Sequence, residues 1–439
     1  SFLANGILTA DRQPHPHAFQ VKHSYQPVSV QPLDLLNGKI AIKNKNWFET
    51  TSKSRLHWEL AADGVVTQLG QMDCPEIPPQ DSAEVQLLIT IPEDRSAEYH
   101  LKLSFRLKHA APWAPAGFEV AWEQFPLPIL KPEQLDHPPQ PTGYLSLEQS
   151  PNSVRITGKD FSLEFDPRCG AWSRYCINGI DYFLEPLLPN FWRVPLDNDG
   201  DALLVNLRLP KFITRLLLPW TRWKSAAAKR KLRNFEVVQL GEDHIQVQTS
   251  FKIPGGRTPL ELTYSIFGNG QVEVGYRFIP RVKLLRAGMQ TQIPANFQQV
   301  TWFGRGPHES MLDRKSGYAV GIYNLDIEDF IHNYVRPQEN ANRSDVRWAR
   351  FTDQDGLGLE IQSTSEYLLN FSVWPYSMAD LEEADHIHEL PRRDFLTLNI
   401  EYAQKGVGDL TSAFMGMPDE AQLLPGNPCE FSFCLKPIF

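Results

Sequence analysis

Several acidic residues stand in motif-like loops of this chain, where carboxyl groups could do acid–base chemistry. Cleavage of a glycosidic bond needs two carboxyl groups that face each other across the bond, one as nucleophile or base and one as acid. Sequence does not show which of them converge, so the surrounding elements must decide it. The candidates are Asp197, Asp199, Asp201, Glu309, Asp313, Glu339 and Asp345.

The cluster Asp197-Asn198-Asp199 could bind a cation or a sugar hydroxyl. An Asp/Asn cluster that follows a proline is more often a turn whose side chains cap backbone groups. We therefore favour the turn and keep ligand binding open.

The segment from Gly304 to Glu309, Gly-Arg-Gly-Pro-His-Glu, combines glycines with a cationic and an acidic side chain. Such a loop could approach a ligand or another domain, but a buried ion pair needs the same residues. We favour the ion pair, because Arg305 and Glu309 could pair with Arg336 and Glu339.

His386 and His388 are two residues apart on an expected strand and would share one face. No third ligand is evident for a metal there. Trp302, Trp348 and Trp374 could stack on pyranose rings, but each has a strand-like context. We expect two of these three tryptophans to lie in the core.

Composition indicates a globular protein of two to four domains, with 439 residues, 42% hydrophobic and 22% charged. The 35 prolines and 11 tryptophans fit many short strands joined by rigid turns. A net charge of -9 argues against a nucleic-acid partner. Five scattered cysteines predict reduced thiols. The sequence has no apolar run long enough to predict a membrane span.

Period-2 alternation of apolar residues dominates residues 24–130 and predicts an immunoglobulin-like β-sandwich. Asp63-Gly64 is a hairpin signal within it. The expected strands carry Ile40/Ile42, Leu56/Trp58/Leu60, Val85/Leu87/Ile89/Ile91 and Leu101/Leu103/Phe105/Leu107.

A proline-rich linker is expected at 131–143, because repeated proline removes the donors of a strand ladder. Residues 144–439 again have strand-like segments, such as 161–165 and 271–278. Residues 202–234 are rich in Leu, Ala, Lys and Arg and predict the exception, a helix that includes the basic run 224–233. The fold class is therefore all-β.

Two motifs carry a family resemblance: Phe191-Trp-Arg-Val-Pro-Leu-Asp-Asn-Asp199 and Trp302-Phe-Gly-Arg-Gly-Pro-His-Glu-Ser310. With the segments 11–16 and 116–122, they resemble the C-terminal part of the large bacterial β-galactosidases of glycoside hydrolase family 2. The resemblance covers essentially all of the chain and implies a fragment of a retaining β-galactosidase.

The resemblance implies a domain order. Residues 1–23 would be the tail of the catalytic (β/α)8 barrel, followed by the sandwich (24–130), the linker (131–143) and a galactose-mutarotase-like supersandwich (144–439). The catalytic glutamates and the magnesium ligands of the family would lie upstream of Ser1, so no catalytic residue and no complete cofactor site is expected in this fragment.

Two binding features are implied in part. Phe2 and Asn5 match the family's sodium site, through a backbone carbonyl and an amide oxygen, with an acidic ligand missing. Residues 406–412 match a loop that brings a tryptophan to the active-site mouth, but here Ser412 or a neighbour replaces it. The candidates for the substrate rim are therefore Asp197, Asn198, Asp199 and Ser412.

Other interpretations stay open: a stand-alone carbohydrate-binding module, an aldose epimerase that uses His308 and Glu309, or a natural small subunit of a two-chain enzyme. The expected partners are a β-galactoside in the full-length enzyme, the missing N-terminal catalytic part and further copies in a homo-oligomer. A cytoplasmic location is expected, with neither a nucleic acid nor a membrane as partner.

Overall fold

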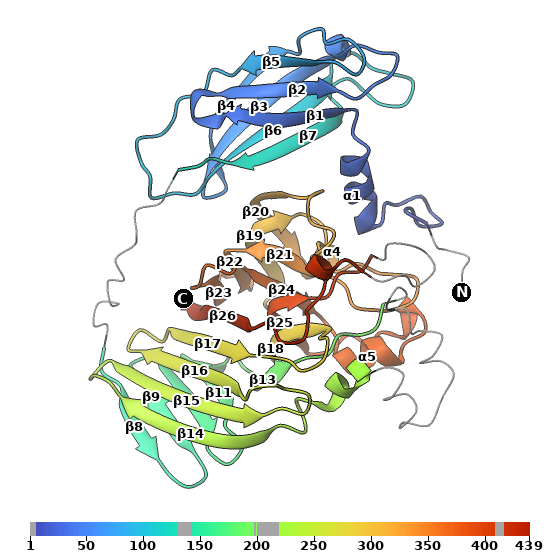
Figure 1. Cartoon of the computed structure of the whole chain (residues 1–439). Helices are drawn as coiled ribbons and strands as arrows, with labels where there is room; N and C mark the ends of the chain where they lie inside the picture. Colours follow the sequence, from blue (N-terminus) through green and yellow to red (C-terminus); the bar gives the residue numbers. More distant parts are fainter. Residues whose placement is uncertain (1–5, 130–142, 197–198, 200–218, 409–416) are drawn as a thin grey trace. The chain divides into compact units, whose positions relative to one another are not determined.

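The computed structural model describes residues 6–129, 143–196, 199, 219–408 and 417–439 (Figure 1). The chain divides into two compact units. Unit 1 comprises Ser1–Pro138 and Ser316–Ile322, and unit 2 comprises Pro139–Lys315 and Tyr323–Phe439. Strands dominate both units, which confirms the all-β prediction.

Unit 1 is a two-sheet sandwich preceded by the helix α1 (Pro16–Ser24). One sheet has the order β1 (Val28–Asp34), β2 (Lys39–Asn44), β5 (Ser82–Gln86). The other has the order β4 (Val65–Asp73), β3 (Ser54–Ala62), β6 (Tyr99–Leu107), β7 (Glu119–Pro126). Two 3-10 turns, η1 (Leu35–Asn37) and η2 (Thr51–Lys53), connect strands.

The period-2 pattern places apolar side chains between these two sheets. Ile40 and Ile42 of β2 are fully buried, as are Leu101 and Leu103 of β6. The predicted hairpin at Asp63-Gly64 joins β3 to β4, and both residues have positive φ, 46° and 84°. Positive φ at both central residues is what a tight hairpin of this hand requires, so the hairpin prediction is confirmed.

One predicted strand is shorter than its pattern. β5 ends at Gln86, although the alternation continues to Ile91. Beyond Gln86 a side chain replaces the strand ladder: the amide group of Gln68 accepts from the N–H of Thr90 at 3.0 Å and donates to its carbonyl at 2.6 Å.

Unit 2 is built from two large antiparallel sheets. The ten-stranded sheet has the order β21 (Arg343–Val346), β24 (Leu369–Trp374), β25 (Phe395–Gln404), β18 (Arg286–Pro294), β13 (Glu185–Asn190), β11 (Ala171–Ile177), β10 (Phe161–Asp166), β9 (Val154–Thr157), β8 (Ser146–Gln149), and β12 (Ile180–Asp181) pairs with β11.

The nine-stranded sheet has the order β14 (Lys231–Gln239), β15 (His244–Lys252), β16 (Leu260–Phe267), β17 (Val272–Phe278), β26 (Cys429–Ile438), β23 (Gly358–Ser363), β22 (Trp348–Thr352), β19 (Gln299–Gly306), β20 (Ala319–Asp326). Short helical turns lie in the connections: η3 (Pro219–Ser225), α4 (Ile327–Phe330), α5 (Met378–Glu383), η4 (Ile387–Glu389) and η5 (Asp419–Ala421).

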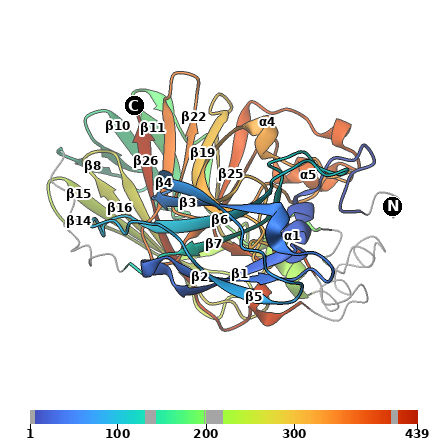
Figure 2. The same cartoon turned by 90° about the horizontal axis from the view of Figure 1, so that it is seen from above.

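The two sheets of unit 2 form two layers around one apolar core. In Figure 1, β14–β17 lie in front of β8, β9 and β11, and Figure 2 shows the same layers from above. Met289 and Leu398 of the ten-stranded sheet belong to the same buried cluster as Val274 and Phe433 of the nine-stranded sheet. Unit 2 is therefore a large sandwich.

The helix predicted at 202–234 is wrong where the structure describes it; residues 202–218 lie outside the described part. Residues 219–225 form a 3-10 turn and the basic run continues into strand β14. β14 pairs along its length with β15, and Leu232 and Phe235 pack against the core. Tertiary pairing thus outweighs the helix propensity of these residues.

Three further expectations concern residues rather than elements. His386 directly precedes the 3-10 turn η4 and His388 lies within it, so neither residue is on the expected strand. All five cysteines are free thiols. Within the described ranges, no helix is long and apolar enough to cross a membrane.

Candidate functional site

A row of polar side chains lies buried on one face of the ten-stranded sheet. We call it the polar face: Arg286 and Gln290 on β18, Ser372 on β24, and Asn399 and Glu401 on β25. Cross-strand pairing puts them on one side, because Gln290 pairs with Asn399 and Asn399 with Ser372. All except Gln290 are fully buried. The opposite side carries core residues such as Met289 and Leu398.

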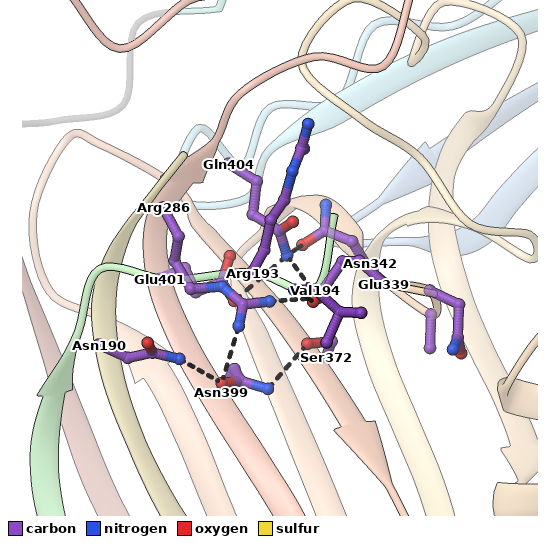
Figure 3. Close-up of polar contacts among 12 residues, drawn as sticks. Asn190, Arg193, Val194, Arg286, Glu339, Asn342, Ser372, Asn399, Glu401 and Gln404 are labelled. Atoms are coloured by element: carbon purple, nitrogen blue, oxygen red, sulfur yellow. Dashed lines mark hydrogen bonds and ion pairs between the residues drawn. The ribbon is translucent and has the colours of Figure 1, made fainter. Parts of the chain in front are cut away.

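Arg286 is the centre of the polar face (Figure 3). Its guanidinium forms an ion pair with Glu339, and its Nε lies 2.8 Å from Oε1 of Glu401. The Nε–Glu401 approach is an ion pair by distance but lacks hydrogen-bond geometry. Arg286 also donates to the carbonyl oxygen of Trp192 at 3.1 Å. One cation therefore faces two buried carboxyl groups.

The two carboxyl groups have different surroundings. Glu339 accepts from the Arg286 guanidinium, from the Gln404 amide at 3.2 Å and from the N–H of Val194 at 3.4 Å. Burial raises the pKa of Glu339, while Arg286 and Arg193 lower it. Burial raises the pKa of Glu401 to about 7, although Arg286 lowers it, and the Glu339 charge raises it further.

The strands β18 and β25 approach each other closely at Gly288. Gly288 lies opposite Glu401, next to a register shift between β18 and β25. A Cβ atom at residue 288 would lie 2.5 Å from the carbonyl oxygen of Ile400 and 2.7 Å from Cα of Glu401. The missing side chain lets the two strands approach closely.

The predicted rim residue Asp199 is buried beside the polar face. Its carboxylate pairs with Arg193 at 2.7 Å and with Lys405 at 3.1 Å, and it accepts from the N–H of Leu196 at 2.9 Å. Burial opposes its ionisation, but Arg193 and Lys405 hold its pKa below the ordinary value. Only 3% of the side chain is exposed, so its carboxylate is taken up by these buried contacts.

Arg193 joins this loop to the end of β25. Its guanidinium donates to the carbonyl oxygens of Lys405 and of Gly406, the latter at 3.1 Å. The side chain is fully buried. Arg193 and Asp199 are therefore tied to residues 405–406.

Asp313 holds the next part of the same connection. Its carboxylate accepts from the N–H of Val407 at 3.0 Å and of Gly408 at 2.7 Å. A Cβ atom at residue 406 would lie 2.5 Å from the carboxyl carbon of Asp313, so a side chain there would displace the Asp313 carboxylate. We call residues 405–408 the loop foot, because they lead into the predicted rim loop.

Glu309, in the Gly304–Glu309 segment, forms a buried ion pair as predicted, but its partner is not the predicted one. Glu309 is buried and pairs with Arg314; it also accepts from the Tyr334 hydroxyl at 2.9 Å and the N–H of Ala341 at 2.8 Å. Burial opposes ionisation of Glu309, but the Arg314 charge leads the effects that keep its pKa low.

The pairing expected between Arg305, Glu309, Arg336 and Glu339 is therefore wrong in its partners. Arg305 pairs with Asp345, which also binds Lys315 at 2.8 Å. The reason is local: Arg314 lies in the turn next to Glu309, and Arg286 reaches Glu339 from the sheet. The partners were not predictable from the motifs themselves.

The tryptophans follow the prediction. Trp302 and Trp374 are fully buried, and Trp348 is half-buried, beneath the guanidinium of Arg350 at 4.7 Å. Trp302 donates to the carbonyl oxygen of Arg305 and Trp374 to that of Asn340, both at 3.0 Å. Two of the three tryptophans are therefore core residues.

The remaining predicted site residues are Asp197, Asn198 and Ser412 for the rim, and Phe2 and Asn5 for sodium. They lie outside the described residues, as does Asp201. In the described part of the chain, no group of three or more His, Cys, Asp or Glu side chains could hold a metal ion. Sequence reasoning missed Arg286, Glu401 and Gln404, which lie in strands.

Comparisons with known proteins give the family. Residues 157–435 match the family described as "Beta galactosidase small chain", and residues 40–128 match "Beta-galactosidase, domain 4". A protein named beta-galactosidase from Priestia megaterium is 29% identical over 447 aligned positions, covering 100% of this chain and 41% of that protein. One from Lactobacillus delbrueckii subsp. bulgaricus is 30% identical, covering 93% and 38%.

The chain also has a low similarity to solved structures that include two sugar epimerases. A galactose 1-epimerase from Lactobacillus acidophilus has 8% identity and a TM-score of 0.41, covering 68% of this chain and 99% of that one. A putative aldose 1-epimerase from Escherichia coli K12 has 10% identity and a TM-score of 0.36, covering 67% and 99%.

The sequence matches thus extend over both units. The chain spans about two fifths of the length of the curated relatives that it matches, and corresponds to their C-terminal portion. Because one family covers more than half of its residues, the chain belongs to the beta galactosidase small chain family.

Proposed function

We propose that this chain is the C-terminal part of a β-galactosidase that hydrolyses terminal, non-reducing β-D-galactose residues with retention of configuration. Its relatives over 93–100% of the chain carry the name beta-galactosidase. The chain contributes loops at the rim of the active site and contacts to the rest of the enzyme. The catalytic carboxyl groups belong to the part of the enzyme upstream of these residues.

The burial of the carboxyl groups supports a non-catalytic role. A glycosidase needs two carboxyl groups that reach the sugar. Asp199, Glu309 and Glu339 have at most 3% of their side chains exposed, and each is bound by an arginine. Asp345 is held by Arg305 and Lys315. These groups stabilise loops and do not face a substrate.

The rim role rests on the loop foot. Arg193, Asp199 and Asp313 fix residues 405–408 from two sides, immediately before the segment that contains Ser412. We infer that Asp197, Asn198 and Ser412 contribute polar groups to the rim, and that Asp199 acts by positioning them. A rim loop without tryptophan would contact the aglycone differently from the family's usual loop.

Ions, partners and location complete the proposal. Asn5 and the Phe2 carbonyl would supply part of a sodium site whose acidic ligand is upstream, and magnesium would bind outside this chain. Copies of the enzyme would assemble into a homo-oligomer, and the enzyme would act in the cytoplasm.

The test is hydrolysis of a nitrophenyl β-galactoside by this chain alone and after mixing with a separately expressed N-terminal part of the enzyme. We expect activity only after mixing. Turnover by this chain alone would place catalytic carboxyl groups within it and would reject the proposed division of roles.

The epimerase alternative gains no support from the site. Glu309, which would have to be an accessible base, is buried against Arg314, Tyr334 and the Ala341 backbone. Burial lowers the pKa of His308 to about 4, with Arg343 adding to the effect. Polarimetry of freshly dissolved α-galactose would show no acceleration by this chain.

A further inference from the structure

Two buried oxygen atoms beside Arg286 lack a hydrogen-bond donor in the described part of the chain. They are Oε2 of Glu401 and Oε1 of Gln404. The two side chains are neighbours, because Nε2 of Gln404 donates to the other carboxyl oxygen of Glu401 at 3.3 Å. A buried acceptor without a donor is costly. A proton on Glu401 would turn one of these acceptors into a donor.

The contacts assign the proton to Glu401 rather than to Glu339. Both oxygens of Glu339 accept from donors: Oε1 from Arg286 and Gln404, Oε2 from the N–H of Val194. Oε1 of Glu401 has the Arg286 contact and accepts from Nε2 of Gln404, but Oε2 has no donor among the described residues. Hydrogen-bond donors thus stabilise both oxygens of Glu339 as a carboxylate, whereas one oxygen of Glu401 has no such donor.

A metal ion is a poorer occupant than a proton at this place. Arg286 and Arg193 already bring positive charge to the Glu339–Glu401 pair. The described residues offer no group of three acidic, histidine or cysteine side chains that could hold a metal. A proton on Oε2 of Glu401 would supply the missing donor and would remove one of the two negative charges that face Arg286.

We propose that Glu401 is a neutral carboxylic acid whose Oε2–H donates to Oε1 of Gln404, and that loss of this proton as the pH rises loosens the loop foot. An ionised Glu401 would present a carboxylate oxygen to the amide oxygen of Gln404. The two acceptors repel each other, so Gln404 must turn away. Gln404 directly precedes Lys405, whose backbone carbonyl is bound by Arg193.

The charged groups that face Glu401 come from three elements. Arg286 lies on β18, Glu339 precedes β21 and Arg193 follows β13. The residues paired with it on β24 and β18, Asn370 and Gly288, are uncharged. Burial is the largest effect and raises the pKa of Glu401 from the ordinary 4.5 to about 7. The proton would therefore leave near neutral pH.

The sign of the pH effect follows from linkage. A carboxyl group with a higher pKa in the folded state binds more protons when folded, so its stabilising effect is complete below the unfolded-state pKa. It is lost as the pH rises to the folded-state pKa. Between pH 5 and 7, this group alone should raise the unfolding equilibrium constant by up to about tenfold per pH unit, and above pH 7 the increase levels off.

Infrared spectroscopy of the whole chain tests the protonation directly. We expect the carbonyl stretch of a buried carboxylic acid at pH 6 and its loss by pH 9. The band should be missing in Glu401→Gln and retained at low pH in the control Glu339→Gln. Absence of the band from the unsubstituted chain at pH 6 would overturn the proposal. Loss of the band in Glu339→Gln but not in Glu401→Gln would also overturn it.

Stability and hydrogen exchange test the consequence. Glu401→Gln keeps a neutral group that can donate to Gln404, so the pH dependence of urea unfolding between pH 5 and 7 should flatten relative to the unsubstituted chain. Amide protection of residues 405–408 should fall from pH 6 to pH 9 only when Glu401 is present. Equal pH dependence in both proteins would refute the coupling. These measurements use this chain alone and do not depend on galactosidase activity.

Discussion

The two sandwiches of this chain use their sheets differently. In unit 1, β3 buries Leu56 and Leu60 on one face and keeps the other half-exposed. In unit 2, β25 is buried on both faces, with Leu398 and Ile400 on the apolar side and Asn399 and Glu401 on the polar side. The first arrangement needs only the hydrophobic effect, whereas the second needs every buried polar group to find a partner.

The largest loss of stability is expected when the cation at the centre of the polar face is removed. Arg286→Met would leave Glu339 and Glu401 buried without their main partner, at a cost of about 4 kcal/mol in the free energy of unfolding at neutral pH. The cost should shrink at acidic pH, where both groups are protonated. Urea unfolding with peptide-level hydrogen exchange would locate the loss in β18 and β25.

Arg286→Lys is the control, since it keeps the charge but not the fork of donors, and its cost should be intermediate. An Arg286→Met protein as stable as the unsubstituted one would mean that the polar face does not require the ion pairs.

A cavity in unit 1 should have a slightly smaller effect with no pH dependence. Leu103 is fully buried in β6, and Leu103→Ala should cost about 3 kcal/mol through lost burial and the space left behind. Exchange in β3 and β6 would report it. A cost that changes between pH 5 and 7 would contradict the simple apolar core of unit 1.

Substitution of Asp313 should affect mainly the loop foot. Asp313→Ala removes the acceptor for the N–H groups of Val407 and Gly408 and should cost about 1 kcal/mol, seen as roughly fivefold faster exchange of these amides. Asp313→Asn keeps one acceptor oxygen and should lose less. Unchanged exchange in both variants would show that Asp313 does not hold the foot.

The smallest effect is expected at an exposed ion pair of unit 1. Lys53 and Glu49 approach to 2.8 Å, but their side chains are 66% and 57% exposed. Glu49→Gln should change the free energy of unfolding by less than about 0.5 kcal/mol, because water screens the pair. A thermal unfolding curve checks this, and a loss above 1 kcal/mol would break the contrast with Arg286.

Sequence patterns predicted unit 1 better than the site in unit 2. The Asp63-Gly64 hairpin and the alternating strands depend on neighbours along the chain, so local rules are sufficient. Residues 395–404 alternate too, but the alternation alone would place Asn399 and Glu401 in solvent. Instead both side chains are buried: Asn190 and Gln290 bind Asn399, and Arg286 approaches Glu401.

The motifs indicated the right regions but not the partners. The sequence identified Asp199, Glu309 and Glu339 as special, and all three are buried ion-pair residues. Their arginines lie 6, 5 and 53 residues away. Only tertiary structure brings Arg286 to Glu339, so spacing could not reveal it. Likewise, the strand β14 replaced an expected helix because β15 supplies its hydrogen bonds.

The close approach at Gly288 limits how this part of the protein can vary. A β-carbon there would collide with the backbone of Ile400 and Glu401, which no rotamer change can relieve. Substitution would therefore push β18 from β25 and disturb the spacing between Arg286 and both carboxyl groups. Position 288 should tolerate glycine alone in a saturation library.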